Sequence, residues 1–196
     1  RYFNMRIVAI LSIALFAGAC SSSEPDTTDD PPIDVPDTPD DPPPVTCAAQ
    51  ADYGTAAFLQ QTAQTQNEGG LITAQGVINQ DVDAVSIELW GAYGIFAETG
   101  IVTGTFEITG DEAQYQTCGT CIFLNADVVD QANPGDLYLA DSGTITITSI
   151  DGNFQASLSN MTFKHVTIDD SAFSTPATEC STTLAAASFD VLLEAQ

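Results

Sequence analysis

The sequence predicts an all-β domain, an antiparallel β-sandwich or jelly roll of about nine strands, preceded by a disordered N-terminal tether. Three observations lead to this prediction. Apolar and polar residues alternate along most of residues 47–196, which places one face of a strand on a core and the other in water. Gly, Asn and Asp separate these runs at short spacing, as turns do. About 150 residues remain after the N-terminal region, a normal length for one domain.

The expected strands carry an apolar residue at every second position. In residues 100–109, Phe106 and Ile108 share one face while the residues between them share the other. The dipeptide Asp151-Gly152 stands between two such runs and predicts a tight hairpin turn. The expected strands are residues 71–78, 84–90, 100–109, 121–129, 137–140, 144–150, 153–159, 161–168 and 187–193.

Three irregularities interrupt this pattern. The apolar residues change face between His165 and Val166, which predicts a β-bulge or burial on both sides of the strand. Short helical turns are expected at residues 54–64 and 111–117. The first of these contains Phe58 and Leu59 but ends in a run of Gln and Thr.

The N-terminal region reads as an export signal. Residues 7–17 form an apolar run interrupted only by Ser12, whereas crossing a bilayer takes roughly 20 apolar residues. The run therefore fits the core of a signal peptide over residues 1–19. Small residues then lead to Cys20, a motif that resembles the lipobox of bacterial lipoproteins and implies lipid on Cys20. The alternative is an ordinary secreted protein with Cys20 as a spare thiol, but lipidation leaves an even number of cysteines.

The region after Cys20 is interpreted as a linker. Residues 21–46 contain eight acidic residues, eight prolines and no basic residue, a composition that cannot form a core. Residues 20–46 are thus expected to be a lipid-anchored, disordered, acidic and Pro-rich spacer. By analogy with lipoprotein sorting, Ser21 after the cysteine implies the outer membrane, at its periplasmic face or at the cell surface.

The charge of the chain excludes one class of partner. Residues 47–196 hold 19 acidic residues and a single basic one, Lys164, so their formal charge is 1 − 19 = −18. Binding to DNA or RNA depends on Lys and Arg that neutralise phosphates. The sequence therefore predicts no nucleic-acid partner. The partners that remain are the membrane, through the lipid on Cys20, and an unidentified protein or glycan.

Four cysteines remain after Cys20, and in an exported domain they predict two disulfides. Our preferred pairing joins Cys47 and Cys180 each to one of the central pair, Cys118 and Cys121. The alternative is a local Cys118–Cys121 bridge with Cys47–Cys180. A redox pair would open a helix, whereas here a strand is expected to follow, and a four-cysteine zinc site would need a second close-spaced pair.

Half of the domain resembles a group of uncharacterised bacterial lipoproteins that share a lipobox, an acidic Pro-rich spacer and a C-x-x-C β-domain of unknown function. Many members have a further cysteine pair, which this chain lacks, and an aromatic residue where Glu179 stands. The resemblance implies the fold and the location. Its pieces are YQTCGTCIFLNADV (115–128), GTITITSI (143–150), NFQASLSNMTFKHVTID (153–169) and STPATEC (174–180).

A hydrolase of the Ser–His–Asp type would have to use His165, the only histidine. Nucleophile-elbow and HExxH patterns are absent from the sequence, so His165 is expected to be partly buried and hydrogen-bonded, and no catalytic residue is assigned. A hydrolase that uses carboxylates alone stays open as an alternative, although no two acids are specifically paired in the sequence.

Calcium is the one cofactor that the sequence suggests, because hard cations bind carboxylates gathered in loops. Solvated turns are the competing interpretation, since acidic residues are dense throughout the chain. Asp169 and Asp170 form a further acidic pair. The candidate ligands are Asp81, Asp83, Asp127, Asp130 and Asp136.

Three aromatic residues, Trp90, Tyr93 and Phe96, lie in a glycine-punctuated segment. Exposed, they would form a binding loop for sugar rings or for a protein. Folded back, they would close one end of the sandwich. The leading functional hypothesis is a non-enzymatic binding or envelope-structural lipoprotein. The alternatives are a carboxylate-dependent hydrolase on envelope or extracellular polymers and a calcium-stabilised adhesion module.

Overall fold

A computed structural model describes residues 45–67, 70–78, 83–128 and 135–195. The predicted signal peptide, Cys20 and nearly all of the linker lie outside these residues, as do Asp81 and Asp130. No helix in the described part of the chain has the length and apolar character needed to cross a membrane.

The all-β prediction is confirmed, because the described elements are strands and two short 3-10 helices. The helices are η2 (Gly94–Phe96) and η3 (Gly110–Ala113). The strands are β1 (Gln60–Gln66), β2 (Leu71–Val77), β3 (Ala84–Trp90), β4 (Gly104–Ile108), β5 (Thr120–Ala126), β6 (Asp136–Asp151), β7 (Asn153–Ile168) and β8 (Ser174–Ala195).

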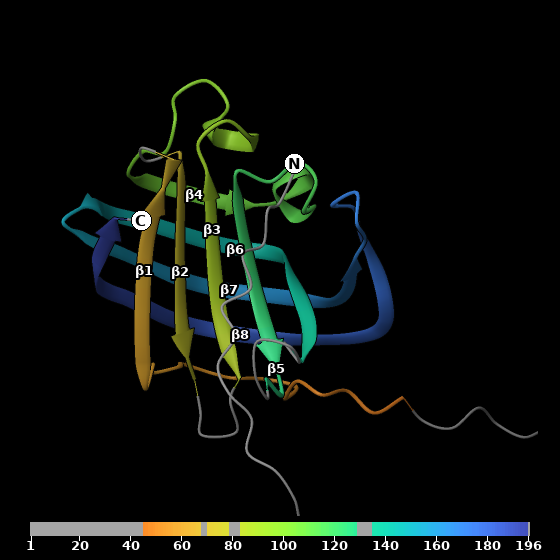
Figure 1. Cartoon of the computed structure of the whole chain (residues 1–196). Helices are drawn as coiled ribbons and strands as arrows, with labels where there is room; N and C mark the ends of the chain where they lie inside the picture. The colour runs from red at the N-terminus through yellow and green to blue at the C-terminus, as the bar shows by residue number, and fades with distance from the viewer. Residues whose placement is uncertain (1–44, 68–69, 79–82, 129–134, 196) are drawn as a thin grey trace, which may run out of the picture. The chain divides into compact units, whose positions relative to one another are not determined.

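The strands form one mixed sheet folded into two layers. In Figure 1, β1, β2, β3 and β5 make one layer, and β4, β6, β7 and β8 cross behind it. Neighbouring strands follow the order β4-β6-β5-β3-β2-β1-β8-β7, and β7 also pairs with β6. Most pairs are antiparallel, but β1 and β8 are parallel. Seven strands therefore form a closed ring of pairings, from β6 through β5, β3, β2, β1, β8 and β7 back to β6. β4 lies outside this ring and pairs with the later part of β6.

The expectation of an antiparallel β-sandwich or jelly roll is not confirmed, because β6 pairs with β5 and β8 pairs with β1, which joins the two layers into one mixed sheet. The first part of β6 pairs with β5 and the later part with β4. Near Gly143 the register between β6 and β7 shifts. Gly143 has φ +133°, and a Cβ there would lie 2.9 Å from the Cα of Met161. Only glycine fits at this bend.

Eight strands are described where about nine were expected. Residues 137–140 and 144–150 belong to β6, and residues 153–159 and 161–168 belong to β7. The helical turn expected at residues 54–64 is wrong, because β1 occupies its second half. Ala63 is the one apolar residue of β1 and the one that is buried. The sequence of this strand therefore shows almost no alternation of apolar and polar residues. The second helical turn is confirmed only as the short η3.

Two local predictions are confirmed. Asp151 pairs with Asn153 across the β6–β7 hairpin, and Gly152 between them has φ +70°. The register of β7 and β8 shifts between Lys164 and Val166, so His165 lies in a bulge. This shift is the change of face that the sequence shows between His165 and Val166.

The main core lies between the two layers. Val85, Ile87 and Leu89 of β3 have no exposed surface, and neither do Phe154 and Phe163 of β7. Because side chains alternate along a strand, the remaining residues of β3 point away from this core. The outer face of β1, β2 and β3 is therefore available to form a site.

Candidate functional site

The two disulfides are Cys47–Cys180 and Cys118–Cys121, so our preferred pairing is wrong and the alternative is correct. The Cα atoms are 5.6 Å apart in the first pair and 5.4 Å in the second. The physical reason is that Cys118 and Cys121 meet across a tight turn, within reach of each other, while residues 51–56 run along β8 and bring Cys47 to Cys180. Two disulfides are typical of an oxidising, exported environment.

The candidate calcium ligands are only partly brought together. Asp83 is buried; its Oδ2 accepts a hydrogen bond from the Tyr53 hydroxyl at 2.7 Å, and its Oδ1 accepts one from the Asp127 backbone N–H at 2.9 Å. Asp136 instead lies 3.9 Å from the Nε2 of His165. Within the described residues, no group of three or more His, Cys, Asp or Glu is capable of holding a metal ion. Asp83 thus joins the N-terminal segment to the end of β5.

The pair of Tyr53 and Asp83 predicts a stability that falls in alkali. Burial, followed by the hydrogen bond to Asp83 and the charge of Asp83, raises the pKa of Tyr53. A raised folded pKa adds stability that is complete below the unfolded value, about 10, and is lost as the pH rises above it. We expect Tyr53→Phe to lower the free energy of unfolding by about 1–3 kcal/mol at neutral pH. Urea unfolding should show the gap to wild type narrowing in alkali; a constant gap would contradict this.

The aromatic candidates divide between two environments. Phe96 has no exposed surface and packs on Phe106, with ring centroids 5.2 Å apart. It therefore closes the core and is not a candidate binding residue. Trp90 is half-buried on the outer face, 6.2 Å from the ring of Tyr93. Tyr93 is 37% exposed. Trp90 and Tyr93 therefore stay available to a ligand.

His165 is partly buried and hydrogen-bonded, as expected. Its Nδ1 lies 2.9 Å from Thr178 Oγ1, which also accepts a hydrogen bond from the Cys180 N–H. The imidazole ring stacks on Tyr138 at 5.0 Å. These contacts hold the bulge of β7 against β8 and give His165 a structural role.

A groove of about 300 Å³ lies on the outer face of β1, β2 and β3. Its floor has two cross-strand rows of polar side chains, set by the strand register. Facing residues on one side of a sheet lie close enough to act together, so each row presents a continuous line of hydrogen-bonding groups. The first row is Gln64, Thr73 and Glu88, and the second is Thr62, Gln75 and Ser86.

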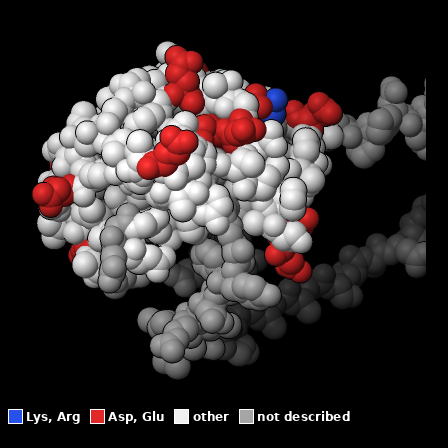
Figure 2. All heavy atoms as spheres, turned by 90° about the horizontal axis from the view of Figure 1, so that it is seen from above, with Lys and Arg blue, Asp and Glu red and all other residues white. Residues whose placement is uncertain are grey.

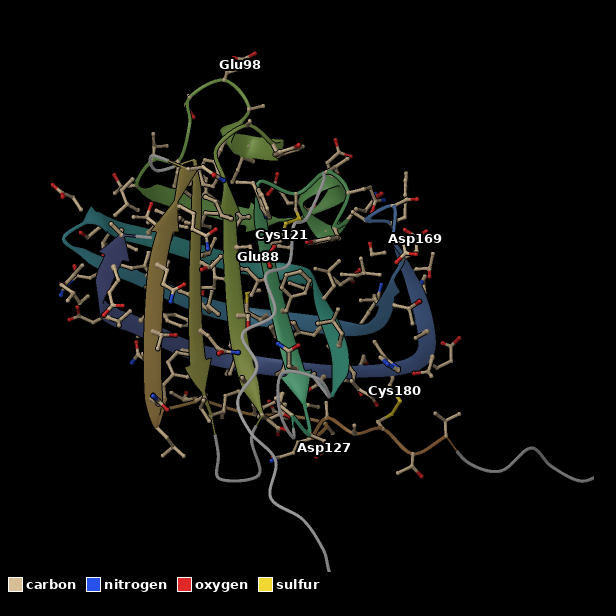
Figure 3. All side chains as sticks on the ribbon, viewed as in Figure 1. Glu88, Glu98, Cys121, Asp127, Asp169 and Cys180 are labelled. Atoms are coloured by element: carbon tan, nitrogen blue, oxygen red, sulfur yellow. A yellow bond between two sulfur atoms is a disulfide. The ribbon has the colours of Figure 1, made fainter. Side chains whose placement is uncertain are left out.

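Of the described residues that line the groove, Glu88 is the only carboxylate. Its Oε2 accepts hydrogen bonds from Trp90 Nε1 at 3.1 Å and from the Tyr115 hydroxyl at 3.5 Å. Figure 3 shows Glu88 over the middle of this layer, and Cys121 is its partner in β5. Two aromatic donors on one oxygen fix the direction in which the carboxylate points.

A second, smaller hydrophobic cluster lies next to Glu88, outside the residues that line the groove. Trp90 and Tyr115 pack on it, and Phe123 belongs to it together with the Cys118–Cys121 disulfide. Tyr115 also contacts Phe123, with ring centroids 5.5 Å apart. The outer face is therefore apolar over β5 and polar over β1, β2 and β3, and Glu88 lies at the boundary.

Buried Glu112 holds the loops behind this cluster. Its carboxylate accepts hydrogen bonds from the backbone N–H groups of Ile95 at 2.8 Å, Gly119 at 3.0 Å and Thr120 at 2.8 Å. Gly119 and Thr120 lie between the two bridged cysteines, and Thr120 is the first residue of β5. Glu112 thus positions the disulfide turn that borders the groove.

The site residues predicted from the sequence do not include Glu88, Thr73 and Gln75. The signal was present in residues 84–90, because the alternation that buries Val85, Ile87 and Leu89 puts Glu88 on the same face as Trp90. What the sequence lacks is the pairing of β2 with β3, which places Thr73 opposite Glu88. Polar residues on one strand show no partner until the register is known.

Acidic side chains are dispersed over the surface. Figure 2 shows them scattered over the visible face, with one basic group among them. Lys164 pairs with Asp141 at 2.8 Å, and both side chains are exposed, so the pair adds little stability.

Comparisons with protein-family models, characterised proteins and solved structures find no match.

Proposed function

We propose that the chain is an exported lipoprotein, anchored through Cys20, whose domain works as a non-enzymatic binding module. The observation that carries the binding role is the groove, in which an oriented carboxylate stands among neutral hydrogen-bonding side chains. Such a combination of a few placed polar groups in a concavity is typical of ligand sites. The lipobox motif and the acidic spacer support display of this groove away from a membrane.

The groove favours binding over hydrolysis. Glycoside hydrolases use two carboxyl groups that flank the scissile bond, about 5–10 Å apart. Among the described lining residues, Glu88 is the single carboxylate. Its Oε2 also accepts a hydrogen bond from Trp90 Nε1 at 3.1 Å, so this oxygen is already bound to a donor of the protein.

One experiment in living cells tests both parts of the proposal. The full chain is produced in a Gram-negative host with a photoreactive benzophenone residue at Gln75, in the groove, or at Ser188, an exposed residue of β8 in the other layer. Labelled palmitate is supplied in parallel, with Cys20→Ser as its control. We expect palmitate on the wild type alone and light-induced adducts from position 75 but not from position 188.

Two results would contradict the proposal separately. Equal labelling of wild type and Cys20→Ser would remove the lipid anchor. Adducts from both positions in equal yield, or none from position 75, would remove the groove as the binding surface.

A further inference from the structure

The backbone of β2 and β3, which form the middle of the groove floor, is not available to a ligand. β2 pairs along its length with β1 on one side and β3 on the other, and β3 pairs with β2 and β5. An extended peptide that adds to a sheet needs an unpaired edge. A ligand over β2 and β3 must therefore be recognised by side chains.

Those side chains are neutral groups that both donate and accept hydrogen bonds. Apart from Glu88, hydroxyl and amide groups predominate, and Ser86 Oγ accepts hydrogen bonds from Gln75 Nε2 at 3.5 Å and from Asn125 Nδ2 at 3.3 Å. Each hydroxyl or amide offers a donor and an acceptor. The matching ligand carries many hydroxyl groups of its own.

The hydrophobic cluster beside the groove adds an apolar requirement. Trp90 and Tyr115 adjoin Glu88 through their polar atoms, and their rings extend over the small hydrophobic cluster. A ligand that touches both regions needs hydroxyl groups at one edge and a C–H surface at another. Pyranose rings have both, and aromatic side chains pack on their C–H faces.

The negative charge of the domain narrows the class of ligand further. The domain has a formal charge of −18, and Glu88 stands in the groove itself. Lys164, the basic residue of the domain, is on β7 in the other layer and pairs with Asp141. Sulfated, phosphorylated or uronic-acid polymers would be repelled.

We propose that the groove binds a neutral glycan chain, whose hydroxyl groups bond to the two polar rows and to Glu88 and which extends past Glu88 so that a ring face packs on Trp90 and Tyr115 beside the groove. The proposal rests on the proposed function and names the ligand class of that site. The groove volume of about 300 Å³ is at the lower end for ligand sites, which suits one or two sugar units of a longer chain.

Trp90 is the only tryptophan in the chain and donates a hydrogen bond to Glu88 of the groove, so intrinsic tryptophan emission reports on a ligand that contacts Glu88. The full chain, without lipid, is titrated with cellohexaose, laminarihexaose, xylohexaose and chitohexaose, and with a lysine hexapeptide as the cationic competitor. We expect a saturable change in emission with at least one glycan, and an affinity that added salt does not weaken, because neutral ligands are not screened.

Paired variants locate the binding. Thr73→Leu removes a central hydroxyl and fills the groove, while Thr146→Leu makes the same change on β6 in the other layer, where Thr146 faces outward and is also half-buried. Glu88→Gln has its match in Glu107→Gln, an exposed residue of β4. We expect Thr73→Leu and Glu88→Gln to weaken glycan binding by roughly tenfold or more, with the two matched variants close to wild type and all four unchanged in melting behaviour.

Each other outcome overturns the inference. Binding of the lysine peptide alone, weakened by salt and by Thr73→Leu, would overturn the glycan class and leave the groove as a binding site. Glycan binding that is equal in Thr73→Leu and Thr146→Leu would place the site elsewhere. An unchanged emission with every glycan also overturns the glycan class, and the adducts from position 75 then decide separately whether the proposed function stands.

Discussion

Replacing Glu112 with alanine is expected to lower the free energy of unfolding by about 3–5 kcal/mol. The side chain is buried and its carboxylate accepts bonds from three backbone N–H groups. Leaving a buried donor without an acceptor costs roughly 1–3 kcal/mol, and three are affected at once. Because domains of this size have a total stability of about 5–15 kcal/mol, the variant should lie close to the threshold for folding.

Equilibrium unfolding in urea, followed by circular dichroism, measures this effect. Glu112→Gln keeps the shape but presents an amide N–H₂ to the backbone donors, and it should lose about half as much stability if the alanine variant does not fold. Glu107→Gln on exposed β4 is the control and should stay within about 0.5 kcal/mol of wild type. A loss below 1 kcal/mol for both Glu112 variants would contradict the structural role of this residue.

Removing the Cys47–Cys180 disulfide, by the double change to alanine, is expected to destabilise the domain by about 3–5 kcal/mol. The bridge spans 133 residues of sequence, and cross-links that close long loops restrict the unfolded chain most. It also secures residues 51–56, whose backbone bonds to β8 include Tyr53 N–H to the Thr183 carbonyl at 2.8 Å. Without it, this segment should become sensitive to proteases.

Thermal unfolding and limited proteolysis measure the two consequences. Asp52→Ala is the matched control, because it removes the side-chain bonds of Asp52 to Gly54 and Thr183 in the same segment and leaves the disulfide in place. These two bonds lower the pKa of Asp52, so what they add to stability is present above about pH 4 and is lost as the pH falls below it. The control should shift the melting temperature far less than the disulfide variant does. Equal shifts, or no new cleavage before β1, would show that the bridge is not what secures this segment.

The stability of the loops near the groove is linked to ligand binding through Glu112, Tyr115 and Glu88. Glu112 positions the turn that contains Cys118 and Cys121, and this turn packs beneath Tyr115. Tyr115 in turn bonds to Glu88. Changes at Glu112 are therefore expected to disturb binding only through folding, whereas changes at Thr73 of β2 and Glu88 of β3 alter the groove itself.

The candidate site was predicted only in part. Trp90 and Tyr93 were identified from their type and their glycine-rich surroundings, and they remain beside the groove. Phe96, in the same segment, is buried, and nothing in the sequence separates it from the other two. Thr73 and Gln75 carry no chemical signal as single residues, because their part in a polar row depends on strands that pair far along the chain.

The sequence by itself determined the all-β class, the hairpin at Gly152 and the bulge at His165, because each follows from alternation or turn chemistry within a few residues. Only the tertiary structure decided the single continuous sheet, the position of β1, the disulfide pairing and the roles of Glu88 and Glu112. The physical reason is that a period of two residues determines which face of a strand is buried. The neighbour of each strand depends instead on long-range packing, and that neighbour decides which polar groups share a surface.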